Sequence, residues 1–262
     1  MELGMPTLIE LPELADCAEL CRELGLQFIE LNMNLPQYQT DRIRPAQFRE
    51  IAERYGVAYT LHLDENMDVS AFNPYVAEAY SRTVMEAIAL AKELHIPVLN
   101  MHLPRGVYFA MPEKKIFLFN VYLEQYLENM AAFRDRCGEA IGGDDVKICV
   151  ENTGGYTDFQ IQALDLLLES PAFALTYDIG HDHGIGGTDG PIILQREERL
   201  VHFHFHDVKG SRLHLPLGSG EIDIEKHFRL AEARKGRIVL ETKTVQGLRQ
   251  SAEWFRQQFQ SA

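Results

Sequence analysis

Three histidines alternate with apolar residues in the stretch VHFHFHD, which spans residues 201–207. On a β-strand, successive side chains point to opposite faces, so His202, His204 and His206 share one face and the apolar residues share the other. Imidazole nitrogens are common metal ligands and also exchange protons near neutral pH. The groups that face these histidines must therefore satisfy them, either with hydrogen bonds or with a metal ion.

Polar side chains also follow most of the other predicted strands, at the position where each strand ends. In chain order they are Glu30 and Asn32, His62, His102, Glu151 and Asn152, Asp178 with His181, His204 with His206 and Asp207, and Glu241. Burying several carboxylates and imidazoles in one place is costly unless cations or hydrogen bonds compensate them. A divalent metal ion is the simplest compensation, and mixed nitrogen and oxygen ligands suit zinc, manganese, iron or cobalt. For the deeper His202 we expect a hydrogen-bonded histidine of the core, and for Glu30 and Asn32 hydrogen bonds at the rim.

These residues belong to a chain in which strand and helix patterns alternate from end to end. Strands are expected near 1–4 and at 27–31, 57–61, 97–101, 146–150, 173–177, 200–205 and 237–240. Helices are expected at 12–24, 45–55, 74–94, 115–136, 158–169, 224–233 and 245–259, and long loops at 103–114 and 207–223. The alternation implies parallel crossovers, so we predict an α/β fold with a single (β/α)8 TIM barrel over residues 1–262. Such a barrel builds its site at the C-terminal rim of the strands, where the polar residues fall.

The composition excludes several classes of function. The chain has 25 Lys and Arg against 39 Asp and Glu, a formal net charge of −14 at pH 7, and this field repels polyanions, so binding to duplex DNA is not expected. No apolar run reaches the roughly 18 residues of a membrane helix, and the start of the chain lacks the basic region of a signal peptide. We therefore expect a cytoplasmic protein without a membrane partner. The 4 cysteines form no CxxC pair and are expected to be buried thiols.

Seven motifs together resemble a known group of barrels. They are YTLHLDENMDVS, LNMHLP, CVENTGG, LTYDIGHDHG, VHFHFHD, HLPLGSGEIDI and IVLET, in this order along essentially the whole chain. The set resembles the xylose-isomerase-like TIM-barrel superfamily, which contains sugar isomerases and epimerases and also the endonuclease IV type of phosphodiesterase (AP endonuclease family 2). The resemblance implies a shared metal site on Glu151, Asp178, His204 and Glu241.

The endonuclease IV branch holds a cluster of metal ions, and this chain has matches for the extra ligands. The resemblance places a second metal on His62, His102, His181 and His214. It departs from the branch at one position, because Arg212 stands where the pattern has an Asp, and a cation cannot ligate a metal. We therefore expect one to three metal ions per chain, and two if the third site is lost.

A further set of residues is expected to contact the substrate. It consists of four cations on the same rim and two polar residues at the exit of the histidine strand: Arg105, Lys209, Arg212 and Lys243, with His206 and Asp207. Cations gathered at one mouth of an acidic chain favour a small, phosphate-bearing molecule. The first expectation is a multi-metal phosphoesterase or phosphodiesterase in which a metal-bound hydroxide attacks the phosphate.

Two other functions stay open. In a single-metal sugar or sugar-phosphate isomerase or epimerase, Glu151 and Glu241 would move a proton and His181 would touch a substrate oxygen. All three residues are then catalytic. A non-catalytic binding barrel is the third possibility, but it would have no need of two acid/base glutamates among so many ligands.

Overall fold

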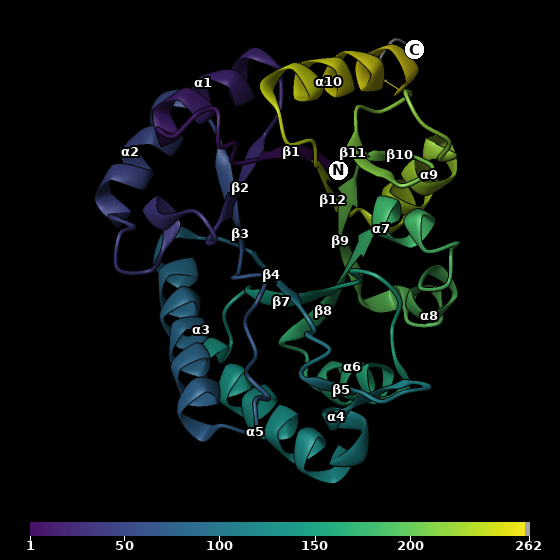
Figure 1. Ribbon diagram of the computed structural model, residues 1–262. Coiled ribbons are helices and arrows are strands. Elements are labelled where there is room, and N and C mark those ends of the chain that lie inside the picture. Colours follow the sequence, from purple (N-terminus) through teal and green to yellow (C-terminus); the bar gives the residue numbers. More distant parts are fainter. Residues whose placement is uncertain (260–262) are drawn as a thin grey trace.

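Eight parallel strands close into a barrel in the computed structural model, which describes residues 1–259 (Figure 1). Around the barrel each strand lies beside the next barrel strand of the chain, as in a (β/α)8 fold. The strands are β1 (Glu2–Pro6), β2 (Phe28–Asn32), β3 (Ala58–His62), β4 (Val98–His102), β7 (Lys147–Glu151), β8 (Phe173–Asp178), β9 (Leu200–Phe205) and β12 (Arg237–Leu240). The predicted fold class is confirmed.

Helices form the outer layer and return the chain to the start of each strand (Figure 1). The longer ones are α1 (Leu14–Glu23), α2 (Pro45–Tyr55), α3 (Pro74–Leu94), α5 (Leu123–Ile141), α6 (Asp158–Leu168), α9 (Ile224–Arg234) and α10 (Val245–Phe259). Pro45 and Pro74 begin α2 and α3, where the fixed φ of proline suits the first turn. Among residues 1–259, no helix is both long and apolar enough to span a membrane.

Each of the two long connections, expected as loops at 103–114 and 207–223, contributes strands to a short hairpin. The first contains a hairpin of β5 (Tyr108–Ala110) and β6 (Lys115–Phe117), followed by the short α4 (Leu118–Val121). The predicted helix 115–136 therefore begins later, because its first residues, KIF, are used in the hairpin. The second connection contains a hairpin of β10 (Asp207–Lys209) and β11 (Arg212–Leu215).

Three short helical segments between β8 and β9 were not predicted. They are α7 (Ile179–Gly184), α8 (Gly190–Leu194) and the 3-10 turn η2 (Glu197–Arg199); a similar turn, η1 (Pro36–Tyr38), follows β2. Their sequence is rich in glycine and too short for helical periodicity to be visible. The carboxylate of Asp178 caps α7 by accepting the backbone N–H of His181 at 2.7 Å.

The histidine strand departs from strict alternation at its start. The pairing of β8 with β9 shifts by one residue between Leu175 and Thr176, so Val201 has no partner in the register. Val201 packs against a small inner cluster of Val98, Cys149 and Ala174, apart from the main core. The expectation that Val201 shares a face with Phe203 and Phe205 is therefore wrong, because a bulge adds one residue at this point.

Candidate metal centre

Four side chains meet at the C-terminal ends of β7, β8, β9 and β12. They are Glu151, Asp178, His204 and Glu241, and one ligand atom from each lies within 4.8 Å of the others. His204 Nδ1 is at the centre, 3.3 Å from Glu151 Oε1, 3.5 Å from Glu241 Oε2 and 3.9 Å from Asp178 Oδ2. The parallel register brings them together, because Asp178 and Val239 are the direct neighbours of His204 on the flanking strands.

These four residues fit a divalent cation. Among the described residues, Asp178 Oδ2, His204 Nδ1 and Glu241 Oε2 are buried polar atoms without a hydrogen-bond partner. Leaving a buried polar atom unpaired costs free energy, and a cation shared by these facing atoms would remove that cost. One imidazole nitrogen and three carboxylate oxygens are a ligand set that manganese, zinc, iron or cobalt accepts.

The electrostatics of the cluster point the same way. Burial would raise the pKa of the Glu151 carboxyl, but the His204 and His102 imidazoles outweigh it and hold that pKa well below its usual range. Burial would also raise the pKa of Glu241, but His204 and Lys243 hold it well below the usual range. Burial would lower the pKa of His204, yet the carboxylates of Glu151, Glu30 and Glu241 raise it well above its usual value. The pocket thus stabilises a positive charge at the place where the four ligand atoms meet.

A second group lies next to the first and shares Glu151. His62 Nε2 and His102 Nε2 lie 3.4 and 3.2 Å from Glu151 Oε2. The other ring nitrogen of His62, Nδ1, lies 2.7 Å from the carbonyl oxygen of Leu63, which fixes the ring so that Nε2 faces the site. Asn100 also donates a hydrogen bond from Nδ2 to Glu151 Oε2. This oxygen therefore already has a donor, whereas Oε1 faces His204.

The remaining histidines gather around Asp178. His206 Nε2 lies 3.2 Å from Asp178 Oδ1, and His206 Nδ1 accepts the backbone N–H of His214 at 2.9 Å. His214 adopts φ of 55°, an uncommon conformation for a residue with a side chain, and its Nδ1 lies 3.9 Å from Glu241 Oε2. His181 Nδ1 lies 3.2 Å from Asp178 Oδ2 and 3.4 Å from Glu151 Oε1. Although burial lowers it, the pKa of His181 is raised to about 10 by Asp178 and Glu151.

The residues predicted to contact substrate are placed in different ways. Lys243 Nζ lies 2.7 Å from Glu241 Oε1, at the edge of the metal group. Arg105 donates to the carbonyl oxygens of Gly154 and Gly155, so it joins the segment between β4 and β5 to the loop after β7. Lys209 and Arg212 are exposed on the β10–β11 hairpin.

Asp207 and His206 are buried and make contacts within the protein. The carboxylate of Asp207 accepts the backbone N–H groups of Val208, Gly220 and Ile222, at 2.9, 2.8 and 3.2 Å. Its contacts therefore hold the loop after β9, and those of His206 orient Asp178.

A cavity of about 260 Å³ opens beside the metal group, on the side of β1, β2 and β3. Its walls combine apolar and polar side chains: Pro6, Thr7, Leu8, Ile9, Glu30, Asn32, Asn34, Leu35, His62, Glu65, Glu241 and Lys243. Sequence reasoning missed Thr7, Asn34 and Glu65, because they lie beyond the strand ends. It also missed Asn100, although the alternation of side chains along β4 indicates that Asn100 points into the barrel with His102.

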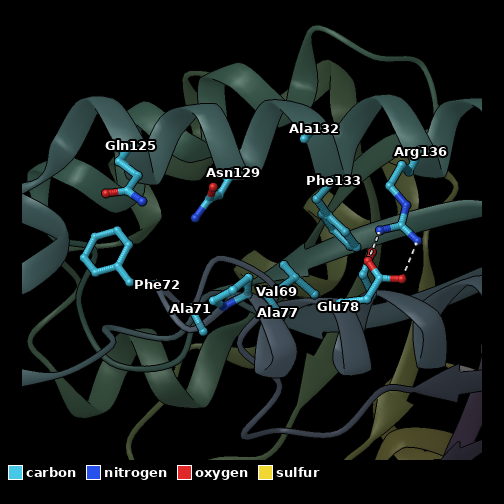
Figure 2. A pocket seen from close by; sticks show the side chains of 12 residues that line it. Val69, Ala71, Phe72, Ala77, Glu78, Gln125, Asn129, Ala132, Phe133 and Arg136 are labelled. Atoms are coloured by element: carbon cyan, nitrogen blue, oxygen red, sulfur yellow. Dashed lines mark hydrogen bonds and ion pairs between the residues drawn. The ribbon is translucent and has the colours of Figure 1, made fainter.

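A second cavity, of about 320 Å³, lies between α3 and α5 on the outer wall (Figure 2). Arg136 makes an ion pair there with Glu78, at 2.7 and 3.4 Å. None of the described residues that line this cavity belongs to the histidine and carboxylate groups of the barrel mouth. The chemistry-bearing residues are therefore concentrated at the rim.

Comparisons with known proteins agree with this architecture. Three solved structures superpose on nearly the whole chain: a D-tagatose 3-epimerase-like protein (21% identity, TM-score 0.78, 98% of this chain and 96% of that one), the D-allulose 3-epimerase of Methylomonas sp. (16%, 0.75, 98% and 96%) and the 3-keto-D-glucoside 4-epimerase of E. coli (14%, 0.78, 98% and 99%). At these identities the likeness is one of fold.

A sequence comparison with curated proteins gives no match. The sequence profile of the family described as xylose isomerase-like TIM barrel matches residues 18–258. The match covers most of the chain, so this protein belongs to the xylose isomerase-like TIM barrel family.

Proposed function

We propose that this protein is a divalent-metal-dependent sugar isomerase or epimerase. The observation that carries the proposal is the placement of Glu151 and Glu241 around His204 Nδ1, each with one carboxylate oxygen within 3.5 Å of it. The names of the structurally similar proteins, a D-tagatose 3-epimerase-like protein, a D-allulose 3-epimerase and a 3-keto-D-glucoside 4-epimerase, support the same class. They favour this function over the multi-metal phosphoesterase that the sequence put first.

The chain's own residues would divide the reaction between two carboxylates. A bound metal ion would supply Lewis acidity, which polarises a carbonyl and its neighbouring hydroxyl. Glu151 and Glu241 have pKa values well below the usual range because of neighbouring cationic groups, so both are ionised and able to accept a proton. One carboxylate would remove the proton from the carbon next to the carbonyl. The other, after taking a proton from solvent, would return it to the opposite face, and the first carboxylate would then release its proton to solvent.

Two cationic groups assist this transfer. His181 Nδ1 lies between Asp178 and Glu151, at 3.2 and 3.4 Å, so its other ring nitrogen, Nε2, would be the donor to a substrate oxygen. Lys243 lies 2.7 Å from Glu241 Oε1 and helps to keep that carboxylate ionised. The mixed cavity beside Glu241 has an apolar wall for a sugar ring and amide and carboxylate groups for its hydroxyls.

Deuterium incorporation from D2O tests the proposal. The protein, loaded with Mn²⁺ or Co²⁺, is incubated with a panel of ketohexoses, and NMR follows both the sugar composition and deuterium at the carbon next to the carbonyl. We expect one ketose to be converted with deuterium uptake, and Glu241→Gln to reduce the rate by about 10²–10⁴-fold, the usual contribution of a positioned acid or base. Glu53→Gln, at an exposed carboxylate of α2 in the outer layer, is the matched control. Metal-loaded protein that converts no ketose or ketose phosphate would contradict the proposal.

A small-molecule phosphoesterase is the second candidate, and one observation favours it. His62, His102 and Glu151 offer three ligand atoms within 4.8 Å of one another, next to the principal group. Hydrolysis of phosphomonoesters or phosphodiesters that is lost in both His62→Ala and His102→Ala would support this candidate. A phosphate-bearing substrate and the cations Arg105, Lys209 and Arg212 as its contacts stay predictions.

A further inference from the structure

A buried carboxylate lies directly beneath the metal group, and the proposed mechanism does not use it. Glu30 of β2 points into the barrel and is 2% exposed, while His202 and His204 of β9 are 0% exposed. β2 and β9 lie on different sides of the barrel, separated by β1 and β12 (Figure 1). The contact between them therefore crosses the inside of the barrel.

Glu30 contacts three side chains in this layer. Its Oε1 lies 2.9 Å from His204 Nε2. Its Oε2 lies 2.9 Å from His202 Nε2 and accepts the hydroxyl of Thr60 at 3.2 Å. Each carboxylate oxygen thus faces the Nε2 atom of a different histidine.

These contacts determine which ring nitrogen of His204 is available to ligate a metal ion. A neutral imidazole carries its proton on one nitrogen only, and the other nitrogen has the lone pair that can ligate. Glu30 Oε1 lies 2.9 Å from Nε2 without the alignment of a hydrogen bond, and its negative charge favours the proton on that nitrogen, which leaves the Nδ1 lone pair facing Glu151, Asp178 and Glu241. A carboxylate behind a ligating histidine also makes the imidazole a stronger ligand.

We infer that Glu30 is a positioning residue that fixes the tautomer and orientation of His204 for metal binding, with His202 holding the opposite oxygen of the same carboxylate. This inference rests on the proposed metal site. His202, which the sequence assigned to the core, then has a defined task, because its Nε2 lies 2.9 Å from Glu30 Oε2 and keeps Glu30 from turning away from His204.

The substitution that tests this is Glu30→Gln. Glutamine has the same shape but only one acceptor oxygen, so it can accept from His202 and Thr60 or from His204, but not from both sides. When its NH2 group faces His204, the ring must move its proton to Nδ1, the atom that should bind the metal. Thr60→Val is the matched control, because it removes a hydrogen bond from the same carboxylate without touching the side that faces His204.

The measurement is Co²⁺ binding by calorimetry, together with the visible absorption spectrum of the Co²⁺ protein, which reports the geometry of the ligands. We expect Glu30→Gln to weaken Co²⁺ binding by about 10–100-fold and to change the spectrum, as is usual when the partner of a ligating histidine is removed. Thr60→Val should bind within about threefold of the wild type with the same spectrum. If Glu30→Gln does not fold, Glu30→Asp, which keeps the charge but shortens the reach, is measured with the same expectation.

The outcomes separate this inference from the proposed function. Unchanged Co²⁺ affinity and spectrum in Glu30→Gln, or in Glu30→Asp where that replaces it, would overturn the positioning role while leaving the metal site intact. A lower melting temperature with unchanged affinity and spectrum would also overturn it, because Glu30 would then act only in the fold. A wild-type protein that binds no Co²⁺ would overturn both proposals.

Discussion

Gly180 shows how closely the side chains of the rim pack. The ring of His206, which orients Asp178, occupies the space that a Cβ atom at Gly180 would need. A glycine in the first turn of α7 therefore lets the imidazole reach the carboxylate. The motif DIGHDHG combines the capping Asp178, this glycine and His181 within four residues.

Gly180→Ala should consequently damage both stability and metal binding. The added methyl group overlaps the His206 ring, and forced overpacking of this kind costs about 1–3 kcal/mol of unfolding free energy. Urea unfolding and Co²⁺ calorimetry measure the two effects. Gly143→Ala is the control, since its Cβ would meet no atom within 4 Å, and we expect no weakening of metal binding there. Equal behaviour of the two variants would contradict the packing argument.

A substitution at Asp207 tests whether this buried carboxylate binds the substrate or stabilises the loop after β9. Three backbone N–H groups donate to it, and removing their acceptor leaves one buried and two partly buried donors unpaired. We expect Asp207→Ala to lower the unfolding free energy by about 1–3 kcal/mol and to speed proteolysis within residues 207–223. Glu221→Gln, in the same loop, should do neither. Unchanged stability with a raised KM would instead assign Asp207 to the substrate.

At the scale of elements, the packing of α9 on β8 gives the protein a pH dependence away from the metal group. His227 of α9 lies against the ring of Tyr177, with centroids 5.4 Å apart. Burial is the largest cause that lowers the pKa of His227, and Lys226 and His183 add to it, against the opposing carboxylates of Asp182 and Asp223; the resulting pKa is about 4. The fold therefore favours neutral His227.

The sign of this effect follows from linkage. In the unfolded chain the histidine titrates near pH 6.5, so between pH 6.5 and 4 the unfolded state binds a proton that the folded state refuses. The stability that neutral His227 contributes is present above pH 6.5 and is lost as the pH falls toward 4. Urea unfolding at pH 7 and pH 5 should show a smaller loss for His227→Gln than for the wild type. An identical loss in both proteins would contradict this assignment.

Different elements were predictable from the sequence to different degrees. Seven barrel strands were clearly predictable because each is a short apolar run with a polar residue at its end, and the first strand was a weaker signal. The topology then brings Glu151, Asp178, His204 and Glu241 to one rim. The hairpins and the helices α7 and α8 were not predictable, because segments of three to six residues are too short for a period to emerge. The sequence placed His202 in the core but Glu30 at the rim, and only the closed barrel reveals that Glu30 is buried and meets His202 across it.

At the scale of the whole molecule, the negative charge argues against duplex DNA as the substrate of the metal site. The chain carries a formal charge of −14, and the buried carboxylates of the mouth add local negative potential that attracts cations. We expect no binding of duplex DNA in a mobility-shift assay at 50 mM salt, where phosphate contacts would be strongest. A retarded complex that dissolves on raising the salt would contradict this expectation and revive the endonuclease comparison.

Metal content per chain tests the central claim most directly. The protein is purified without chelator, and elemental analysis is made on the wild type, His62→Ala and Glu241→Ala. The proposed single-metal proton transfer predicts one equivalent of a divalent metal in the wild type, retained in His62→Ala and lost or strongly reduced in Glu241→Ala. Two or three equivalents in the wild type, falling in His62→Ala, would contradict it and return the multi-metal phosphoesterase to first place.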